Sequence, residues 1–96
     1  MMQGARRDIV DSEWTTVKTW DYGKMTHETG WHWYCCVPDA GPANDDGFML
    51  GDLSNHQITE HEDGTLTVSP SILIGGQGSK HQAWHGFLEH GTWREA

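Results

Sequence analysis

The chain has 96 residues with 14 acidic and 6 basic side chains, which gives a net charge of −8. This balance disfavours direct binding to a nucleic-acid backbone, because such binding needs clustered Lys and Arg. A membrane-spanning helix is excluded, because no apolar run approaches the roughly 20 residues that one requires. The length fits one domain with a thin core, in which six Trp residues can bury much of the apolar surface.

The N-terminal part predicts a tail and two strands. Residues 1–7 are expected to form a flexible tail, and residues 8–96 a single small domain. Residues 13–20 are rich in β-branched and aromatic side chains, which favours a strand despite poor alternation. Residues 31–37 predict a second strand. Its alternation places on one face Trp31, Trp33, Cys35 and Val37, and on the other His32, Tyr34 and Cys36.

The middle of the chain predicts a loop, a short strand and a hairpin. Residues 38–47 are polar and contain two Pro and two Gly residues, so we expect a mobile loop outside the core. Residues 48–50 predict a short strand. Residues 58–68 predict a hairpin that turns at Asp63 and Gly64, because both residue types tolerate positive φ.

The last third predicts a strand followed by a closing hairpin. Residues 65–74 favour a strand in which Pro70 ends the pairing or marks an edge or a bulge, and residues 75–79 are expected to form a flexible link. Residues 84–88 and 92–95 are predicted to pair across a turn at Gly91. A helix over residues 79–90, capped by Ser79, is the alternative, but its Gly content disfavours it.

The predicted fold is therefore mainly β. We expect a small single-domain antiparallel sheet, or an open barrel or sandwich, with little helix. The period-two placement of apolar residues predicts a core built on Trp31, Trp33, Leu66, Val68, Ile72 and Phe87.

Seven His residues and two adjacent Cys residues raise the question of a metal site. Zinc takes Cys and His in a tetrahedral shell with bonds of about 2.0–2.3 Å. Residues four apart on a regular strand are separated by roughly 13 Å, which keeps His32 from Cys36 and His81 from His85. The candidate metal ligands are therefore Cys35, Cys36 and His85, brought together by long-range folding. The alternative is that no cofactor binds and that Cys35 packs as a small hydrophobic residue.

Catalytic chemistry has little support, and we expect that the chain is not an enzyme. A Cys–His pair, or His61 beside Glu60 or Asp63, would be the candidates for thiolate or acid–base chemistry. The acidic cluster leads into a hairpin turn, however, and residues 75–78 lack the Lys–Ser/Thr ending of a phosphate-binding loop. No catalytic residue is assigned.

Three motifs carry a resemblance to a known family. They are Trp33-Tyr-Cys35, the strand that contains Ser69-Pro-Ser71, and the pair Trp84-His-Gly-Phe87 and Gly91-Thr-Trp93. They resemble a family of short bacteriophage-encoded domains of unknown function, some of which are mislabelled ammonia monooxygenase. The resemblance spans residues 31–95 and implies a phage origin and an accessory role. Many relatives carry separated Cys residues suited to zinc, whereas Cys35 and Cys36 are adjacent here.

Binding to another protein is the function that we expect. The candidate binding residues lie on the closing hairpin and are Trp84, His85, Phe87 and Trp93, because aromatic side chains dominate protein interfaces. The N-terminal residues lack the apolar stretch of a signal peptide, which favours the cytoplasm of the host cell. We therefore expect a phage accessory protein that binds and modulates a host protein, with a homodimer left open. A zinc-stabilised binding module and an acidic mimic of nucleic acid, which would inhibit a host defence or transcription factor, are the alternatives.

Overall fold

The computed structural model describes residues 1–39, 47–75 and 83–96, and it confirms the predicted mainly β fold. The described residues form two sheets. Sheet A has the order β1 (Met2–Gln3), β10 (Thr92–Glu95), β9 (Trp84–Glu89), β8 (Leu66–Ile74) and β7 (Gln57–Glu60). Sheet B has the order β2 (Ala5–Arg6), β4 (Asp21–His27), β5 (Gly30–Pro38) and β6 (Phe48–Asp52), and β3 (Ile9–Val10) also pairs with β4.

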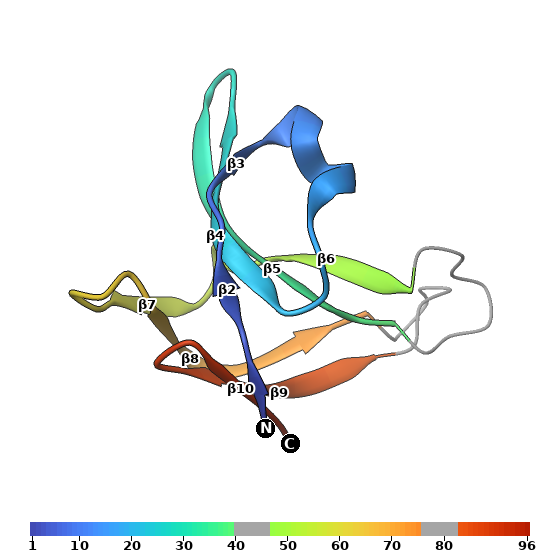
Figure 1. Cartoon of the computed structure of the whole chain (residues 1–96), viewed down its shortest axis with the longest axis vertical. Coiled ribbons are helices and arrows are strands. Elements are labelled where there is room, and N and C mark those ends of the chain that lie inside the picture. Colours follow the sequence, from blue (N-terminus) through green and yellow to red (C-terminus); the bar gives the residue numbers. More distant parts are fainter. Residues whose placement is uncertain (40–46, 76–82) are drawn as a thin grey trace.

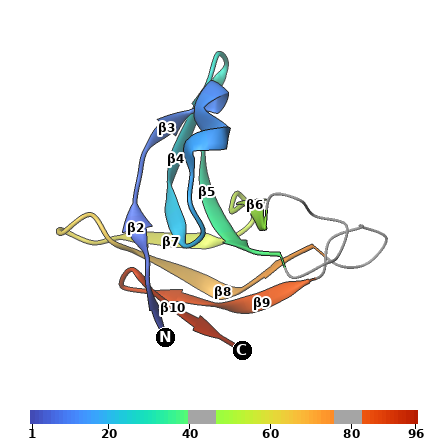
Figure 2. The same cartoon turned by 45° about the vertical axis from the view of Figure 1, so that its right-hand side comes forward.

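The N-terminal residues connect the two sheets. Figures 1 and 2 show β4 and β5 upright, with the strands of sheet A running across below them. β1 pairs antiparallel with β10 in sheet A, whereas β2 pairs in parallel with β4 in sheet B. Between them, the Gly4 N–H donates a hydrogen bond of 2.8 Å to the Gly91 carbonyl oxygen. The prediction of a flexible tail over residues 1–7 is therefore wrong.

The predicted strand over residues 13–20 is also wrong, because residues 11–16 form the 3-10 helix η1 (Asp11–Thr16). Local hydrogen bonds stabilise it. The Glu13 carboxylate accepts a bond of 3.0 Å from the Val10 N–H, and the Thr16 hydroxyl donates one of 2.7 Å to the Glu13 carbonyl oxygen. Such short-range bonds compete with the ladder of a sheet. The strand preference of the side chains is thereby overridden.

The main core lies between the two sheets. Its buried residues are Tyr22, Cys35, Val37, Met49, Leu53, Leu66, Val68, Ile72, Trp84, Leu88 and Trp93. The predicted core residues Leu66, Val68 and Ile72 are confirmed, and Trp33 packs against the core while partly buried. The prediction of Trp31 in the core is wrong: it is 54% exposed, because it lies at the end of β5 next to the β4–β5 turn. Figures 1 and 2 show this turn at the end of β4 and β5 that is far from sheet A.

A second, smaller core covers the other face of sheet B. It consists of Ile9, Val17, Met25, Tyr34 and Cys36. Strand β3 and the segment after η1 supply Ile9 and Val17, so both faces of sheet B are covered near its middle. The Tyr34 hydroxyl donates a hydrogen bond of 2.6 Å to the Arg7 carbonyl oxygen, and burial raises the pKa of this hydroxyl.

Most of the remaining predicted elements are confirmed. β6 is the expected short strand, and β7 and β8 form the expected hairpin with Gly64 at φ +86°. β9 and β10 form the closing hairpin, so a helix over residues 79–90 is wrong for residues 84–89. The predicted mobile loop and link fall largely on residues 40–46 and 76–79, which lie outside the described residues. Within the described ranges, no helix has the length and apolar character to cross a membrane.

Candidate functional site

The C-terminal hairpin separates the four predicted binding residues into two pairs. Trp84 and Trp93 point into the core and are 5% and 1% exposed. His85 is exposed and Phe87 is partly exposed, because alternate residues of a strand face opposite sides. The prediction that Trp84 and Trp93 present a binding surface is therefore corrected: they belong to the interior.

The buried pair anchors the hairpin. The rings of Trp84 and Trp93 meet edge to face with centroids 5.5 Å apart, and Trp20 packs against both at 5.8 and 5.7 Å. The Trp93 indole N–H donates a hydrogen bond of 2.9 Å to the Trp20 carbonyl oxygen. A Cβ atom at Gly86 would clash with the Trp84 ring and the Arg94 carbonyl oxygen, so this glycine allows the ring to lie against the backbone.

The outer face of sheet A carries the other side of the hairpin. We use this name for the surface formed by Ser71, Leu73, His85, Phe87, Glu89 and Arg94. Arg94 lies over the Phe87 ring, with its Cζ 4.2 Å from the ring centroid, and its guanidinium pairs with the Glu89 carboxylate at 2.8 Å. Leu73 lies opposite His85 in the ladder and is 59% exposed.

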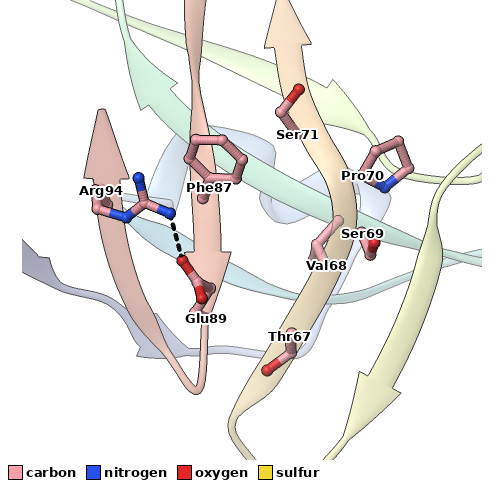
Figure 3. A pocket seen from close by; sticks show the side chains of 8 residues that line it. All are labelled: Thr67, Val68, Ser69, Pro70, Ser71, Phe87, Glu89 and Arg94. Carbon is pink, nitrogen blue, oxygen red and sulfur yellow. Dashed lines mark hydrogen bonds and ion pairs between the residues drawn. The ribbon is translucent and has the colours of Figure 1, made fainter. Parts of the chain in front are cut away.

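A bulge in β8 hollows this face. Between the pairs Val68–Leu88 and Ile72–Gly86, β8 advances by four residues while β9 advances by two. Pro70 lies in this interval, so among the alternatives predicted for this position the register shift favours the bulge. The result is an open hollow of about 450 Å³ (Figure 3), lined by Thr67, Val68, Ser69, Pro70, Ser71, Phe87, Glu89 and Arg94.

The hollow combines an apolar floor with polar groups that are already oriented. Phe87 and Pro70 supply apolar surface, while the Arg94–Glu89 pair lies at the edge (Figure 3). His85 Nε2 lies 2.9 Å from the Ser71 hydroxyl, which holds its ring beside the bulge. This arrangement can accept a side chain of a partner and offer it both aromatic contact and hydrogen bonds.

The predicted metal ligands are not brought together. Cys35 and Cys36 are adjacent on β5, so Cys35 enters the main core and Cys36 enters the smaller core on the opposite face of sheet B. His85 is exposed on the outer face of sheet A. Burial raises the pKa of the Cys35 thiol and raises that of Cys36 to about 12, so both thiols stay protonated at neutral pH. His81 lies outside the described residues.

Two further His pairs were not anticipated from the sequence. His61, considered above beside Glu60 and Asp63, stacks instead on His90 with ring centroids 3.7 Å apart, and its Nε2 lies 2.7 Å from the Thr67 hydroxyl. His27 and His32 meet across the β4–β5 hairpin. A predicted hairpin with its turn between residues 27 and 30 would have brought these two residues together, because they are only five positions apart in the sequence.

Comparison of the chain with models of protein families, with curated proteins and with solved structures finds no match.

Proposed function

We propose that the chain is a protein-binding module that attaches to a partner through the outer face of sheet A. In the setting that the sequence resemblance implies, the module is a phage accessory protein and the partner is a host protein that it modulates. The observation that carries the proposal is the hollow beside Phe87 and Arg94, flanked by the exposed Leu73.

The composition of this face supports the proposal. Protein interfaces have an apolar centre and a polar rim, and aromatic residues and Arg are over-represented among the residues that carry most of the binding energy. Leu73, Pro70 and Phe87 supply the apolar centre, and His85 and Arg94 supply polar groups beside it.

The arrangement is also ordered before any partner arrives. Arg94 is held by Glu89 and by the Phe87 ring, and His85 is held by Ser71. Side chains that are fixed in advance lose less conformational entropy on binding. A net charge of −8 favours a partner with a basic surface, whose approach it would accelerate.

The test combines identification of the partner with matched variants. A photo-crosslinking amino acid at position 73 should capture one bacterial protein. The same amino acid at position 10 is the control and should capture none, although Val10 is similarly accessible at 46% exposure. The affinity of the purified partner is then measured. Phe87→Ala should weaken it about 30-fold, which corresponds to roughly 2 kcal/mol.

Two controls separate contact from folding. Trp31→Ala is the control for Phe87→Ala, because it removes an exposed aromatic ring from sheet B. A second test variant, Leu73→Asp, places a charge on the outer face of sheet A, and Val10→Asp is its control because it makes a similar change at a different surface. Both controls should bind as the wild type does. Full affinity in folded Phe87→Ala and Leu73→Asp proteins would remove this face from the interface.

A further inference from the structure

A pair of His residues lies on sheet B, away from the face used in the proposed function. His27 ends β4 and His32 lies on β5, and both side chains are partly buried. His27 Nε2 and His32 Nδ1 are 2.8 Å apart, while the ring centroids are 4.8 Å apart and the ring planes differ by 12°. The ring planes are therefore nearly parallel, and one nitrogen of each ring faces a nitrogen of the other across 2.8 Å.

Asp11 fixes which nitrogen of His27 carries its proton. The Asp11 Oδ2 atom lies 3.1 Å from His27 Nδ1. An ionised carboxylate can only accept a hydrogen bond, so His27 Nδ1 is the donor. In a neutral ring the lone pair is then on Nε2, which is the atom that faces His32. A carboxylate that orients a His ring in this way is the usual partner of a metal-binding His.

We propose that His27 and His32 form a binding site for a divalent transition-metal ion, with His27 Nε2 and His32 Nδ1 as the protein ligands. Imidazole nitrogen favours Zn²⁺, Ni²⁺ or Cu²⁺ over Mg²⁺ and Ca²⁺, which prefer oxygen ligands. Within the described residues, no group of three or more His, Cys, Asp or Glu side chains is placed to hold a metal. The pair thus supplies two ligands, and water completes the coordination.

The change in geometry that binding requires is small. Zinc–nitrogen bonds of about 2.0–2.1 Å at a tetrahedral angle place the two nitrogens about 3.3 Å apart. The nitrogens therefore separate by roughly half an ångström, and both rings turn so that their lone pairs converge on the ion. The side chain of His27 is 35% exposed, so this turn takes place at the surface. The proton on His32 Nδ1 moves through solvent to Nε2 of the same ring, which frees the Nδ1 lone pair for the ion.

The surrounding charge favours a cation. The Asp11 carboxyl group lies 3.1 Å from His27 Nδ1. Asp52 lies at the end of β6, opposite Tyr34 and diagonal to His32 in the ladder. Burial opposes the ionisation of Asp52, but hydrogen bonds from Ser54 and the nearby imidazoles hold its pKa below its ordinary value. Two acidic side chains therefore neighbour the pair.

The experiment is calorimetric titration of the full chain with Zn²⁺, with Mg²⁺ as the comparison, followed by NMR of the imidazole nitrogens. One Zn²⁺ should bind per chain, and the signals of His27 Nε2 and His32 Nδ1 should shift. His27→Gln and His32→Gln should each abolish this site. Asp11→Ala should weaken it about tenfold or more and, as a spectroscopic signature, should reduce the Nδ1–H form of His27 in the metal-free protein.

The second His pair provides the matched control. His61 and His90 stack with ring centroids 3.7 Å apart, and His61 Nε2 already lies 2.7 Å from the Thr67 hydroxyl. His61→Gln and His85→Gln should leave Zn²⁺ binding unchanged. Absence of binding at millimolar Zn²⁺, or binding that survives in folded His27→Gln and His32→Gln proteins, would overturn the proposal. Because the pair lies on sheet B, neither result bears on partner binding by the outer face of sheet A.

Discussion

Replacement of Trp93 by Ala tests the assignment of the closing hairpin to the core. Trp93 is 1% exposed, packs against Trp20 and Trp84, and donates its indole N–H to the Trp20 carbonyl oxygen. Truncation of a buried Trp costs about 3–5 kcal/mol. A domain of this size has a total stability of about 5–15 kcal/mol. Trp93→Ala should therefore remove a large fraction of the free energy of unfolding.

Trp93→Phe separates the hydrogen bond from the packing. Phe retains much of the apolar surface but leaves the Trp20 carbonyl oxygen without its indole donor, so the expected loss is about 1–2 kcal/mol. Urea denaturation followed by circular dichroism measures both variants. The loss from Trp93→Phe should lower the melting temperature by about 4–8 °C for each kcal/mol.

Trp14→Ala is the control, because Trp14 is 45% exposed on η1 and its removal should cost little. If Trp93→Ala unfolds the chain completely, Trp93→Phe still gives a measurable value. A loss below about 1 kcal/mol for folded Trp93→Ala, equal to that of Trp14→Ala, would refute the placement of this hairpin face in the core.

Three other substitutions or conditions give defined outcomes. Gly86→Ala should cost about 1–3 kcal/mol in urea denaturation, because the added methyl group meets the Trp84 ring and the Arg94 carbonyl oxygen; unchanged stability would contradict this packing. Arg6→Ala should lower the free energy of unfolding by about 1–2 kcal/mol, since Arg6 bonds Asp8, Glu60 and the Gly64 carbonyl oxygen. Arg94→Ala, which removes the exposed Arg94–Glu89 pair, should cost less than about 1 kcal/mol. Equal costs would count against a role of Arg6 in bridging the N-terminal segment to the β7–β8 hairpin. The free energy of unfolding should fall as the pH rises from 9.0, the ordinary thiol pKa, toward about 12, the pKa of Cys36 in the folded chain. The reason is that the Cys36 thiol ionises first in the unfolded chain. Cys36→Ala should make this fall less steep.

The sequence predicted the elements that depend on neighbouring residues. The β7–β8 and β9–β10 hairpins follow from alternation and from the turn residues Gly64 and Gly91, which have φ values of +86° and +76°. β1 and β2 could not be predicted in this way. Met2 pairs with Trp93 at the far end of the chain, and such a long-range pairing leaves no local pattern in residues 1–7. Helix η1 was missed because side-chain preference for strands is weaker than local hydrogen bonds there.

The candidate site was predicted only in part, because alternation identifies two faces without saying which is buried. Trp84 and Leu88 on one face of β9, and His85 and Phe87 on the other, are both plausible interior sets. The packing of Trp20 against Trp84 and Trp93 decides between them, and this contact joins residues more than 60 positions apart. The hollow was missed for a similar reason. The shape of the hollow depends on the register shift between β8 and β9 around Pro70. The sequence indicated a bulge as one possibility at Pro70, but it did not indicate that β9 is the neighbouring strand.

The buried and exposed faces of the hairpin depend on one another. Trp84 and Trp93 hold β9 and β10 against the core, and this fixes the backbone from which His85, Phe87 and Arg94 project. A rigid backbone is what lets the Arg94–Phe87 contact and the His85–Ser71 contact form in the free protein. Trp93→Phe, which removes no atom of the outer face, should therefore leave partner affinity nearly unchanged while lowering stability. Phe87→Ala should do the reverse, and this opposite pattern is what distinguishes an anchored binding face from a merely exposed edge of the core.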